Sequence, residues 1–387
     1  MIETLRIESF KSIAEAQLDL GQVNVFIGAN GSGKSNLLEA LALLSAAASG
    51  KVDQSTLVWR GARASRYFRP MFEGTKNDAE TSLEASFKTS TYRTTLSAPD
   101  SGRSLPWDYR VEKLTTGRRV IADRSDLKHS RTDSTVGFAA LKLAEVAPDS
   151  AASVFMKSLL EYGIYSADTP ILHGWTLDQQ EREPVGLGGG RLAEAIAEIL
   201  ADTDLRKILT NEFVSCIDWF AEFGVLRIRS RNMEISRREF AFMDRYFKKT
   251  KGVPDFLGTG DVNEGVLFLA FLAVLGLHPR APKIFAVENV DHGLNPRLAK
   301  RMMTTLAERI LKAEDRQAFL TTHNPMVLDG LPLYDERVRL FTVARTDSGR
   351  SVIRRVEVSD KLLKMADQGW TLSRLWVMGH LGGVPNV

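Results

Sequence analysis

The stretch Gly28-Ala-Asn-Gly-Ser-Gly-Lys-Ser35 decides the fold that we expect for this chain. It follows a short apolar run at 23–28, VNVFIG, and leads into SNLLEALALLSAAA at 35–48, which is rich in strong helix formers. The stretch matches the pattern G-x-x-x-x-G-K-[ST] between a strand and a helix, a loop whose backbone N–H groups wrap around phosphate oxygens. The sequence therefore predicts a nucleotide-phosphate site here.

Each part of this loop has an expected task. The glycines allow close backbone approach, and the positive end of the following helix dipole attracts phosphate. Lys34 is expected to reach the β- and γ-phosphates, and the hydroxyl of Ser35 is expected to hold Mg²⁺. The predicted nucleotide-binding residues of this segment are Gly28, Ala29, Asn30, Gly31, Ser32, Gly33, Lys34, Ser35 and Asn36.

Both ends of the chain have the pattern of an α/β protein. Alternating apolar residues predict a hairpin near the start, and the last third alternates strands at 283–288 and 317–323 with helices at 265–277 and 296–314. This order favours a parallel sheet. We expect a discontinuous nucleotide domain with an antiparallel β lobe, a mainly helical insertion and a C-terminal strand/helix tail. The predicted ranges are 1–120 with 250–345 for the nucleotide domain (its β lobe at about 55–120), 121–249 for the insertion and 346–387 for the tail.

A second glycine-rich stretch, GLGGG at 186–190, lies between two predicted helices. It has no preceding strand and no Gly-Lys-Ser ending. We interpret it as a flexible loop and not as a second phosphate site.

Two later strand ends carry groups suited to phosphate chemistry. The strand at 283–288 ends in Glu288, followed by NVDHGLNP, and resembles a Walker B segment whose carboxylate holds Mg²⁺ through water. The strand at 317–323 ends in His323, where an imidazole beside the phosphate site can sense the γ-phosphate. A structural histidine is the alternative.

These motifs together resemble the ABC-type ATPases of the RecF, SMC and OLD-like group. The segments that carry the resemblance are LRIESFKSI at 5–13, GANGSGKSN at 28–36, the shortened signature Asn263-Glu264-Gly265, ENVDHGLNP at 288–296 and TTHNPMVLDGL at 321–331. The resemblance implies an ABC-type P-loop ATPase head with a parallel core sheet and an antiparallel β lobe. It covers residues 1–50 and 255–345.

The resemblance also implies a mechanism and its ligands, ATP and Mg²⁺. Two heads would pack head to tail, so that Asn263, Glu264 and Gly265 of one chain close over the ATP of the other. One loop and one signature in a single chain then imply a homodimer or higher oligomer. The standard LSGGQ signature of transporter ATPases is missing.

The chain departs from this pattern where the relatives carry a second, catalytic glutamate. Asn289 stands there, and an amide can orient the attacking water but cannot take its proton. Asp291 either supplies the base or serves only as a dimer contact. Hydrolysis is therefore expected to be slow or partner-dependent, and a non-hydrolysing ATP-bound scaffold is the alternative. Gln54 is a candidate, by position only, for the Q-loop glutamine.

The charge pattern bears on partners. Lys and Arg number 51 against 48 Asp and Glu, so the net charge of +3 implies no nucleic acid by itself. Basic residues gather at 103–131 and 226–251, where a solvated face and a DNA-phosphate surface are both open interpretations. No nuclease signature is found, so we expect a separate effector such as a nuclease, by analogy with ATPase subunits of antiphage systems such as PARIS or Septu. A DNA repair or recombination ATPase is the alternative.

A cytoplasmic location is the simplest expectation. No apolar run is long enough to cross a bilayer, and the first residues lack the layout of a secretory signal. The single cysteine, Cys216, excludes an intrachain disulfide and is expected to pack in the core.

Overall fold

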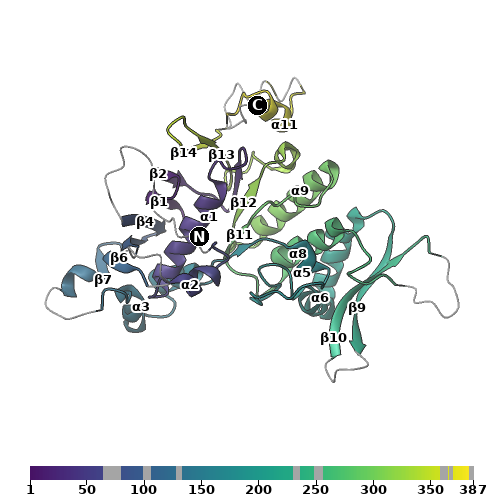
Figure 1. The fold of residues 1–387 in the computed structure, drawn as a ribbon, viewed down its shortest axis with the longest axis horizontal. Coiled ribbons are helices and arrows are strands. Elements are labelled where there is room, and N and C mark those ends of the chain that lie inside the picture. Colours follow the sequence, from purple (N-terminus) through teal and green to yellow (C-terminus); the bar gives the residue numbers. More distant parts are fainter. Residues whose placement is uncertain are drawn as a thin grey trace.

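Two six-stranded sheets and a two-stranded ribbon make up the β-structure of the described residues (Figure 1). The computed structural model describes residues 1–63, 80–98, 106–127, 133–229, 236–247, 256–357, 365 and 369–382.

The core sheet has the order β14-β13-β3-β12-β11-β8 and confirms the predicted parallel arrangement. Strands β8, β11, β12, β3 and β13 are parallel, and β14 is an antiparallel edge strand. The central strands β3, β11 and β12 are buried along their whole length, as expected for strands covered on both faces. The strands are β3 (Val23–Ile27), β8 (Ile164–Tyr165), β11 (Ile284–Val287), β12 (Gln317–Thr322), β13 (Val338–Arg345) and β14 (Ser351–Arg355).

The second sheet is antiparallel and forms the β lobe, in the order β2-β1-β4-β5-β6-β7. Helix α1 (Lys34–Ala48) packs with residues of both sheets in one apolar cluster, and 13 of its 15 residues are buried. The loop that precedes α1 lies between the two sheets, where Gly33 is next to Ser12 of the β lobe and Ser351 of the core sheet. The strands are β1 (Thr4–Phe10), β2 (Ile13–Asp19), β4 (Glu80–Phe87), β5 (Ser90–Ser97), β6 (Asp108–Thr116) and β7 (Arg119–Asp123).

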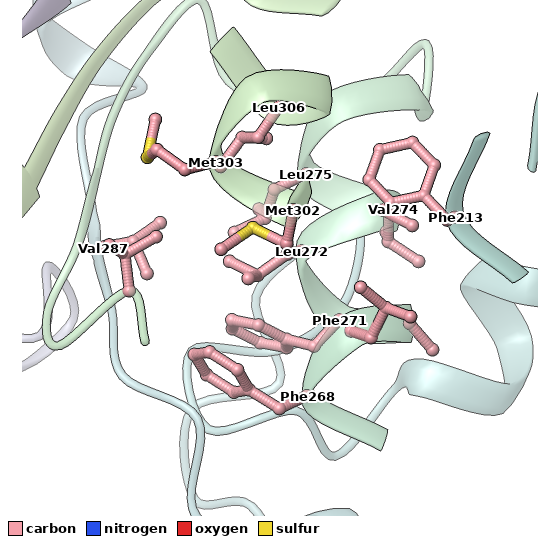
Figure 2. Close-up of a cluster of buried hydrophobic side chains, with 14 of the residues drawn as sticks. Phe213, Phe268, Phe271, Leu272, Val274, Leu275, Val287, Met302, Met303 and Leu306 are labelled. Atoms are coloured by element: carbon pink, nitrogen blue, oxygen red, sulfur yellow. The ribbon is translucent and has the colours of Figure 1, made fainter. Parts of the chain in front are cut away.

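A second apolar cluster surrounds helix α8 (Glu264–Leu277), which is apolar on every side. Figure 2 shows its side chains, among them Phe271 and Leu275, against Met302 and Leu306 of the amphipathic helix α9 (Pro296–Lys312) and Val287 of β11. A helix without a polar face must be enclosed. The position of α8 at the centre of this layer follows from that requirement.

The segment predicted as a mainly helical insertion contains short helices and an additional β-hairpin. Its helices are α3 (Phe138–Lys142), α4 (Ala151–Leu160), α5 (Thr169–Leu172), α6 (Leu192–Ala201) and α7 (Thr203–Ile208), followed by a π-helical turn (Leu209–Phe213). The hairpin of β9 (Phe220–Arg229) and β10 (Ser236–Asp244) was not predicted. It forms because aromatic residues of both strands, such as Phe220 and Phe242, pack against one another and against the α8 cluster. Since β8 also lies inside 121–249 but belongs to the core sheet, the domain boundaries stay a prediction.

Shorter elements complete the chain. Helix α2 (Gln54–Val58) follows α1, and α11 (Leu372–Val377) packs on the 3₁₀ turn Pro325–Gly330. Further 3₁₀ turns are Arg124–Leu127, Leu143–Glu145 and Val214–Cys216.

The loop at 186–190 is not flexible, so that prediction was wrong. Its residues are buried up to Gly189, and the N–H groups of Gly188 and Gly190 each donate to Asp178 Oδ2 at 3.1 Å. The other oxygen, Asp178 Oδ1, accepts from the N–H of Gln180 at 2.8 Å. An internal carboxylate thus occupies the place that an anion would take, and the expectation that this loop is no second phosphate site agrees with the contacts.

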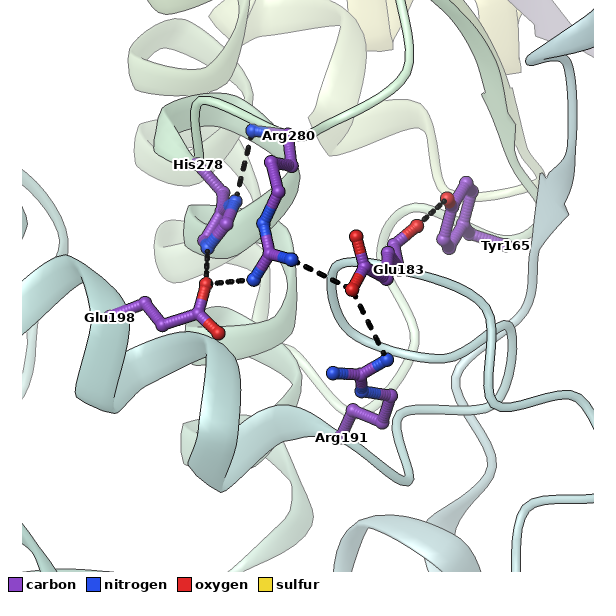
Figure 3. A network of polar contacts seen from close by, with 6 residues as sticks. All are labelled: Tyr165, Glu183, Arg191, Glu198, His278 and Arg280. Atoms are coloured by element: carbon purple, nitrogen blue, oxygen red, sulfur yellow. Dashed lines mark hydrogen bonds and ion pairs between the residues drawn. The ribbon is translucent and has the colours of Figure 1, made fainter.

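A network of polar side chains lies at the amino end of β11 (Figure 3). His278 Nε2 bonds Glu198 Oε2 at 2.9 Å, Arg280 pairs with both Glu198 and Glu183, and Arg191 approaches Glu183 at 3.6 Å. Burial lowers the pKa of His278, while Glu198 acts in the opposite direction. The charged groups of this network are paired with one another within the chain.

Candidate nucleotide-binding site

The glycines of the loop at 28–35 are required by close contacts and by backbone conformation. A Cβ on Gly28 would lie 2.1 Å from the carbonyl oxygen of Val343 in β13. Gly33 has φ +111° and ends the loop directly before α1, and a Cβ there would lie 2.1 Å from Ser351 Oγ. Gly31 has φ +75° but open space around it. The loop is therefore shaped by its own glycines and by the neighbouring strands β13 and β14 of the core sheet.

The start of α1 offers donors that nothing in the described part of the chain uses. No side chain caps the helix, and its first backbone bond runs from Leu37 N to Gly33 O, so the N–H groups of 33–36 are free of internal partners. The hydroxyl of Ser32 is buried and, within the described residues, also has no partner. Free N–H groups at a helix N-terminus beside an orphaned hydroxyl fit a phosphate group.

Lys34 lies inside the loop and not on the surface. It is 7% exposed, and its Nζ donates to the carbonyls of Gly28 at 2.7 Å and Ala29 at 2.8 Å. Burial lowers the pKa of Lys34, and the carboxylates of Glu288 and Asp291 oppose that shift. A desolvated ammonium group held in this way is suited to pair with a phosphate anion.

Ser35 and Glu288 meet as predicted for a Mg²⁺ site. The Ser35 hydroxyl donates to Glu288 Oε1, across 253 residues of sequence, and the backbone of Glu288 is fixed by a 2.9 Å bond from its N–H to Tyr165 O. Among the described residues no group of three or more His, Cys, Asp or Glu side chains could hold a metal by itself. One carboxylate and one hydroxyl leave most positions to water and substrate phosphates, which suits Mg²⁺.

The remaining predicted catalytic residues lie on the loops that follow β11 and β12. Asn289 has φ +52°, a conformation that asparagine tolerates better than most residues, and its N–H bonds Thr321 Oγ1 at 3.0 Å. Asp291 is 7% exposed and accepts from Thr322 Oγ1 at 2.6 Å. His323 is exposed at the tip of β12. Asp291 thus joins the two loops to each other, which is a structural task beside any chemical one.

The predicted signature lies at the start of α8, against the loop after Glu288. Asn263 caps the helix by accepting the N–H of Val266 at 3.1 Å, and Glu264 accepts the hydroxyl of Thr169 at 2.7 Å. A Cβ on Gly265 would lie 2.6 Å from the carbonyl oxygen of Gly293. Gly265 is therefore needed for packing within its own chain, independently of any partner.

A chain of hydroxyl groups under the loop was missed by the sequence analysis. Asn36 Nδ2 donates to Ser12 Oγ at 2.6 Å, and Ser12 Oγ lies 2.6 Å from Ser351 Oγ. Ser351 Oγ donates in turn to the carbonyl of Ser32 at 2.6 Å. The side chain of Asn36 is thereby used inside the chain, which leaves its backbone N–H for a nucleotide.

An ion-pair cluster beside α1 was also missed. Glu39, 3% exposed, pairs with Lys11 and accepts from Arg63 Nε at 2.8 Å. Burial would raise the pKa of Glu39, but the bond from Arg63 and the charge of Lys11 outweigh it, so the pKa is lowered. A single acid in the otherwise apolar run at 37–48 was the available signal.

Gln54 does not lie beside the phosphate loop. It is exposed at the start of α2, beyond the end of α1 that is farthest from the loop. The chain approaches the loop again only later, where Arg63 reaches Glu39. The proposal of Gln54 as Q-loop glutamine was wrong because α1 carries the chain about 22 Å away.

The basic run at 226–251 is described only in part. Arg227 is exposed on β9 directly opposite Arg238 on β10, whereas Arg245 donates to the carbonyl of Phe220 at 2.8 Å. Arg231, Lys248, Lys249 and Lys251 lie outside the described residues, as do Arg103 and 128–131 of the other run.

Comparison with known proteins agrees with these features. A family described as "AAA ATPase domain" matches residues 1–94, and one described as "AAA domain, putative AbiEii toxin, Type IV TA system" matches residues 261–329. The Smc head bound to the C-winged helix domain of ScpA has a similar fold, with a TM-score of 0.52, 14% identity and coverage of 94% of this chain and 99% of that one. An Smc head with an extended coiled coil, bound to the C-terminal domain of ScpA derived from Pyrococcus furiosus, is similar with a TM-score of 0.50 and 13% identity. That match covers 95% of this chain and 98% of the other.

Curated relatives match a shorter part of the chain. The RecF DNA replication and repair protein of Heliobacterium modesticaldum is 35% identical over 89 residues, which are 22% of this chain and 23% of RecF. An uncharacterized protein of Methanocaldococcus jannaschii is 37% identical over 90 residues, which are 22% of this chain and 41% of that protein. These matches support the interpretation of the chain as similar to the RecF/SMC-like ABC-type ATPases. Because these matches span less than half of either relative, the activity and partners of the whole relatives are not transferred with them. Among the helices that the structure describes, none is both long and apolar enough to cross a membrane.

Proposed function

We propose that this chain binds and slowly hydrolyses Mg²⁺-ATP, dimerises head to tail around it, and controls a separate effector in the cytoplasm, in bacterial antiphage defence. The observation that carries the proposal is the set of unused donors at the start of α1 beside the Ser35–Glu288 pair. Within the described residues, the N–H groups of 33–36 and the hydroxyl of Ser32 have no partner, and these residues belong to the phosphate-loop motif. An external triphosphate with Mg²⁺ supplies what the site lacks.

The division of labour follows from the contacts. The N–H groups of 33–36 and the Ser32 hydroxyl hold phosphate oxygens, and Lys34 exchanges its two carbonyl partners for the β- and γ-phosphates. Ser35 and Glu288 would hold Mg²⁺, which would supply positive charge to neutralise the phosphates. A response of His323 to the γ-phosphate is supported by its position directly after β12, which pairs with β3 up to the residue before Gly28.

Head-to-tail association is supported by the separation of the two half-sites within one chain. The described side-chain contacts of Asn263 and Glu264 are to α8 and Thr169, and none reaches the phosphate loop. The N–H groups of Glu264 and Gly265 have no partner in the described chain. A second copy brings a phosphate to those donors.

ATP turnover by the wild-type chain and by a Lys34→Ala variant tests this function. We expect slow turnover in the wild type and none in the variant. Equal turnover rates in the two proteins would contradict the proposal that the chain hydrolyses ATP. If the wild type then still bound ATP, the result would favour a non-hydrolysing ATP-bound scaffold, as Asn289 in place of a catalytic glutamate suggests. A wild-type chain that does not bind ATP would contradict both the hydrolysis and the scaffold proposals.

A DNA repair ATPase of the RecF/SMC type is the second candidate. Its support is the similarity to RecF together with Arg227 and Arg238, like charges that oppose each other across β9 and β10 at a cost in stability. DNA affinity that falls steeply between 50 and 200 mM salt, on the order of the losses seen for proteins with several phosphate contacts, supports it. Absence of DNA binding at 50 mM salt contradicts it.

A further inference from the structure

A tryptophan next to the predicted signature is exposed although its position is rigid. Trp175 is 66% exposed, and its ring stacks on His173 with centroids 4.4 Å apart and planes 12° from parallel. Leu177, two residues later, is 87% exposed. Neither side chain contributes to the two apolar clusters of the chain.

Several bonds fix this loop to the segment that leads into α8. The Nδ1–H of the buried His173 donates to the carbonyl of Thr259 at 2.6 Å, and the Thr259 hydroxyl donates back to the carbonyl of His173 at 3.3 Å. The N–H of Trp175 donates to the carbonyl of Pro170 at 2.8 Å. Thr169, at the start of the same loop, donates to Glu264 of the signature. The indole is therefore displayed at a set position relative to Glu264.

A large apolar group kept outside the core on a rigid support is typical of an interface anchor. Tryptophan combines a large contact area with few rotatable bonds, so little conformational freedom is lost when a partner covers it. On a flexible loop the ring could fold back onto the protein surface. Here the stacking on His173 and the bond to Pro170 keep it outward.

The charges on the two surfaces favour a second copy of this chain as the partner. Three acidic residues lie on the segments that surround Trp175. Asp168 caps the helix Thr169–Leu172, Thr169 bonds Glu264, and Asp261 follows Gly260, where a Cβ would lie 3.8 Å from Trp175 Nε1. The loop side carries Arg63, which pairs with Glu39 and still has a side chain that is 64% exposed. These two surfaces belong to the same chain but carry opposite charge, which favours a head-to-tail pair over a symmetric contact of like faces.

We propose that Trp175 and Leu177 form the apolar centre of the surface that receives the phosphate-loop side of a second copy when ATP is bound. This inference rests on the head-to-tail dimer of the proposed function and adds its anchor. Each dimer then holds two such contacts, one beside each signature.

Sedimentation of the full chain with Mg²⁺ and a non-hydrolysable ATP analogue tests the anchor, with nucleotide affinity measured separately by a fluorescent analogue. Trp175→Ala is expected to leave nucleotide affinity of the monomer unchanged and to weaken dimerisation by about tenfold or more. Leu177→Asp, at a position without packing to lose, is expected to weaken it in the same direction. Trp175→Phe keeps a ring on His173 and is expected to restore part of the dimer.

Trp59 provides the matched control. It is 50% exposed and lies near Arg182, on the side of the sheet away from the phosphate loop. Trp59→Ala is expected to dimerise as the wild type does. Dimerisation of Trp175→Ala and Leu177→Asp as tight as that of Trp59→Ala overturns the anchor and leaves the dimer standing. A wild-type chain that binds the analogue and stays monomeric overturns the dimer of the proposed function, and the anchor with it.

Discussion

The two glycine-rich loops of this chain, at 28–35 and 186–190, have similar composition and opposite uses of their backbone. In the second loop the N–H groups of Gly188 and Gly190 point at one oxygen of Asp178, so the anion is part of the chain. In the first loop the N–H groups before Leu37 and the hydroxyl of Ser32 have no partner in the described residues.

The difference shows that glycine content alone does not make a ligand site. A loop that brings its own carboxylate is complete and contributes to stability. A loop at the start of a buried helix, with a lysine in place of a carboxylate, is complete only with an external anion. The following predictions separate these two cases, from the largest expected effect to the smallest.

The largest effect is expected at Gly33. Gly33→Ala forces a side chain into φ +111° and brings its Cβ to 2.1 Å from Ser351 Oγ, so ATP affinity is expected to fall by about 100-fold or more. Isothermal titration measures it, with circular dichroism as a check of folding. Gly31→Ala is the matched control: its φ is +75° but nothing lies within 4 Å, and a smaller loss is expected. Equal losses in both variants would contradict the role of the Ser351 contact.

Phosphate from solution is expected to stabilise the folded chain only by binding to the loop at 28–35. Pyrophosphate with Mg²⁺ at 100 times its dissociation constant is expected to raise the free energy of unfolding by about 2.7 kcal/mol, because it binds the folded state alone. Urea denaturation measures the increase. An Asp178→Ala variant is expected to show the same increase, and Gly33→Ala little of it. If Asp178→Ala did not show this increase in the free energy of unfolding, pyrophosphate binding would depend on both loops.

Removal of the internal anion should affect stability and not binding. Asp178→Ala leaves the N–H groups of Gly188, Gly190 and Gln180 without their acceptor. Because unsatisfied buried donors are costly, the free energy of unfolding is expected to fall by about 2 kcal/mol. Urea denaturation measures the loss. Asp178→Asn, which keeps one acceptor oxygen, is expected to lose less, and a variant as stable as the wild type would contradict the interpretation.

The smallest effect is expected under the first loop. Ser351→Ala removes the hydroxyl that joins Ser12 to the carbonyl of Ser32, a contribution of about 1 kcal/mol for one hydrogen bond. If that bond positions the loop, ATP affinity is expected to fall about fivefold by the same titration. Ser348→Ala, in the exposed turn before β14, is the control. Unchanged affinity in Ser351→Ala would show that the loop holds its shape without the hydroxyl chain.

Local pattern was enough for much of the fold. The strands and helices next to the loop were predicted because each depends on apolar spacing within a few residues. Glu288 and His323 were found from motifs of the same short range, and their roles stay predictions. The β9–β10 hairpin was not predicted because its aromatic residues gain their contacts from a distant helix layer. Gln54 was misplaced because its position in space depends on the direction of α1.

The sequence by itself determined that a phosphate loop stands between a buried strand and a helix, because that motif is contiguous and its chemistry is local. Tertiary structure alone decided which of two glycine-rich loops keeps its donors free. The deciding group is Asp178, which accepts the N–H groups of Gly188 and Gly190 at one loop, whereas no side chain caps the start of α1 at the other. Whether an N–H group has a partner depends on what folding brings next to it, and neither composition nor spacing contains that information.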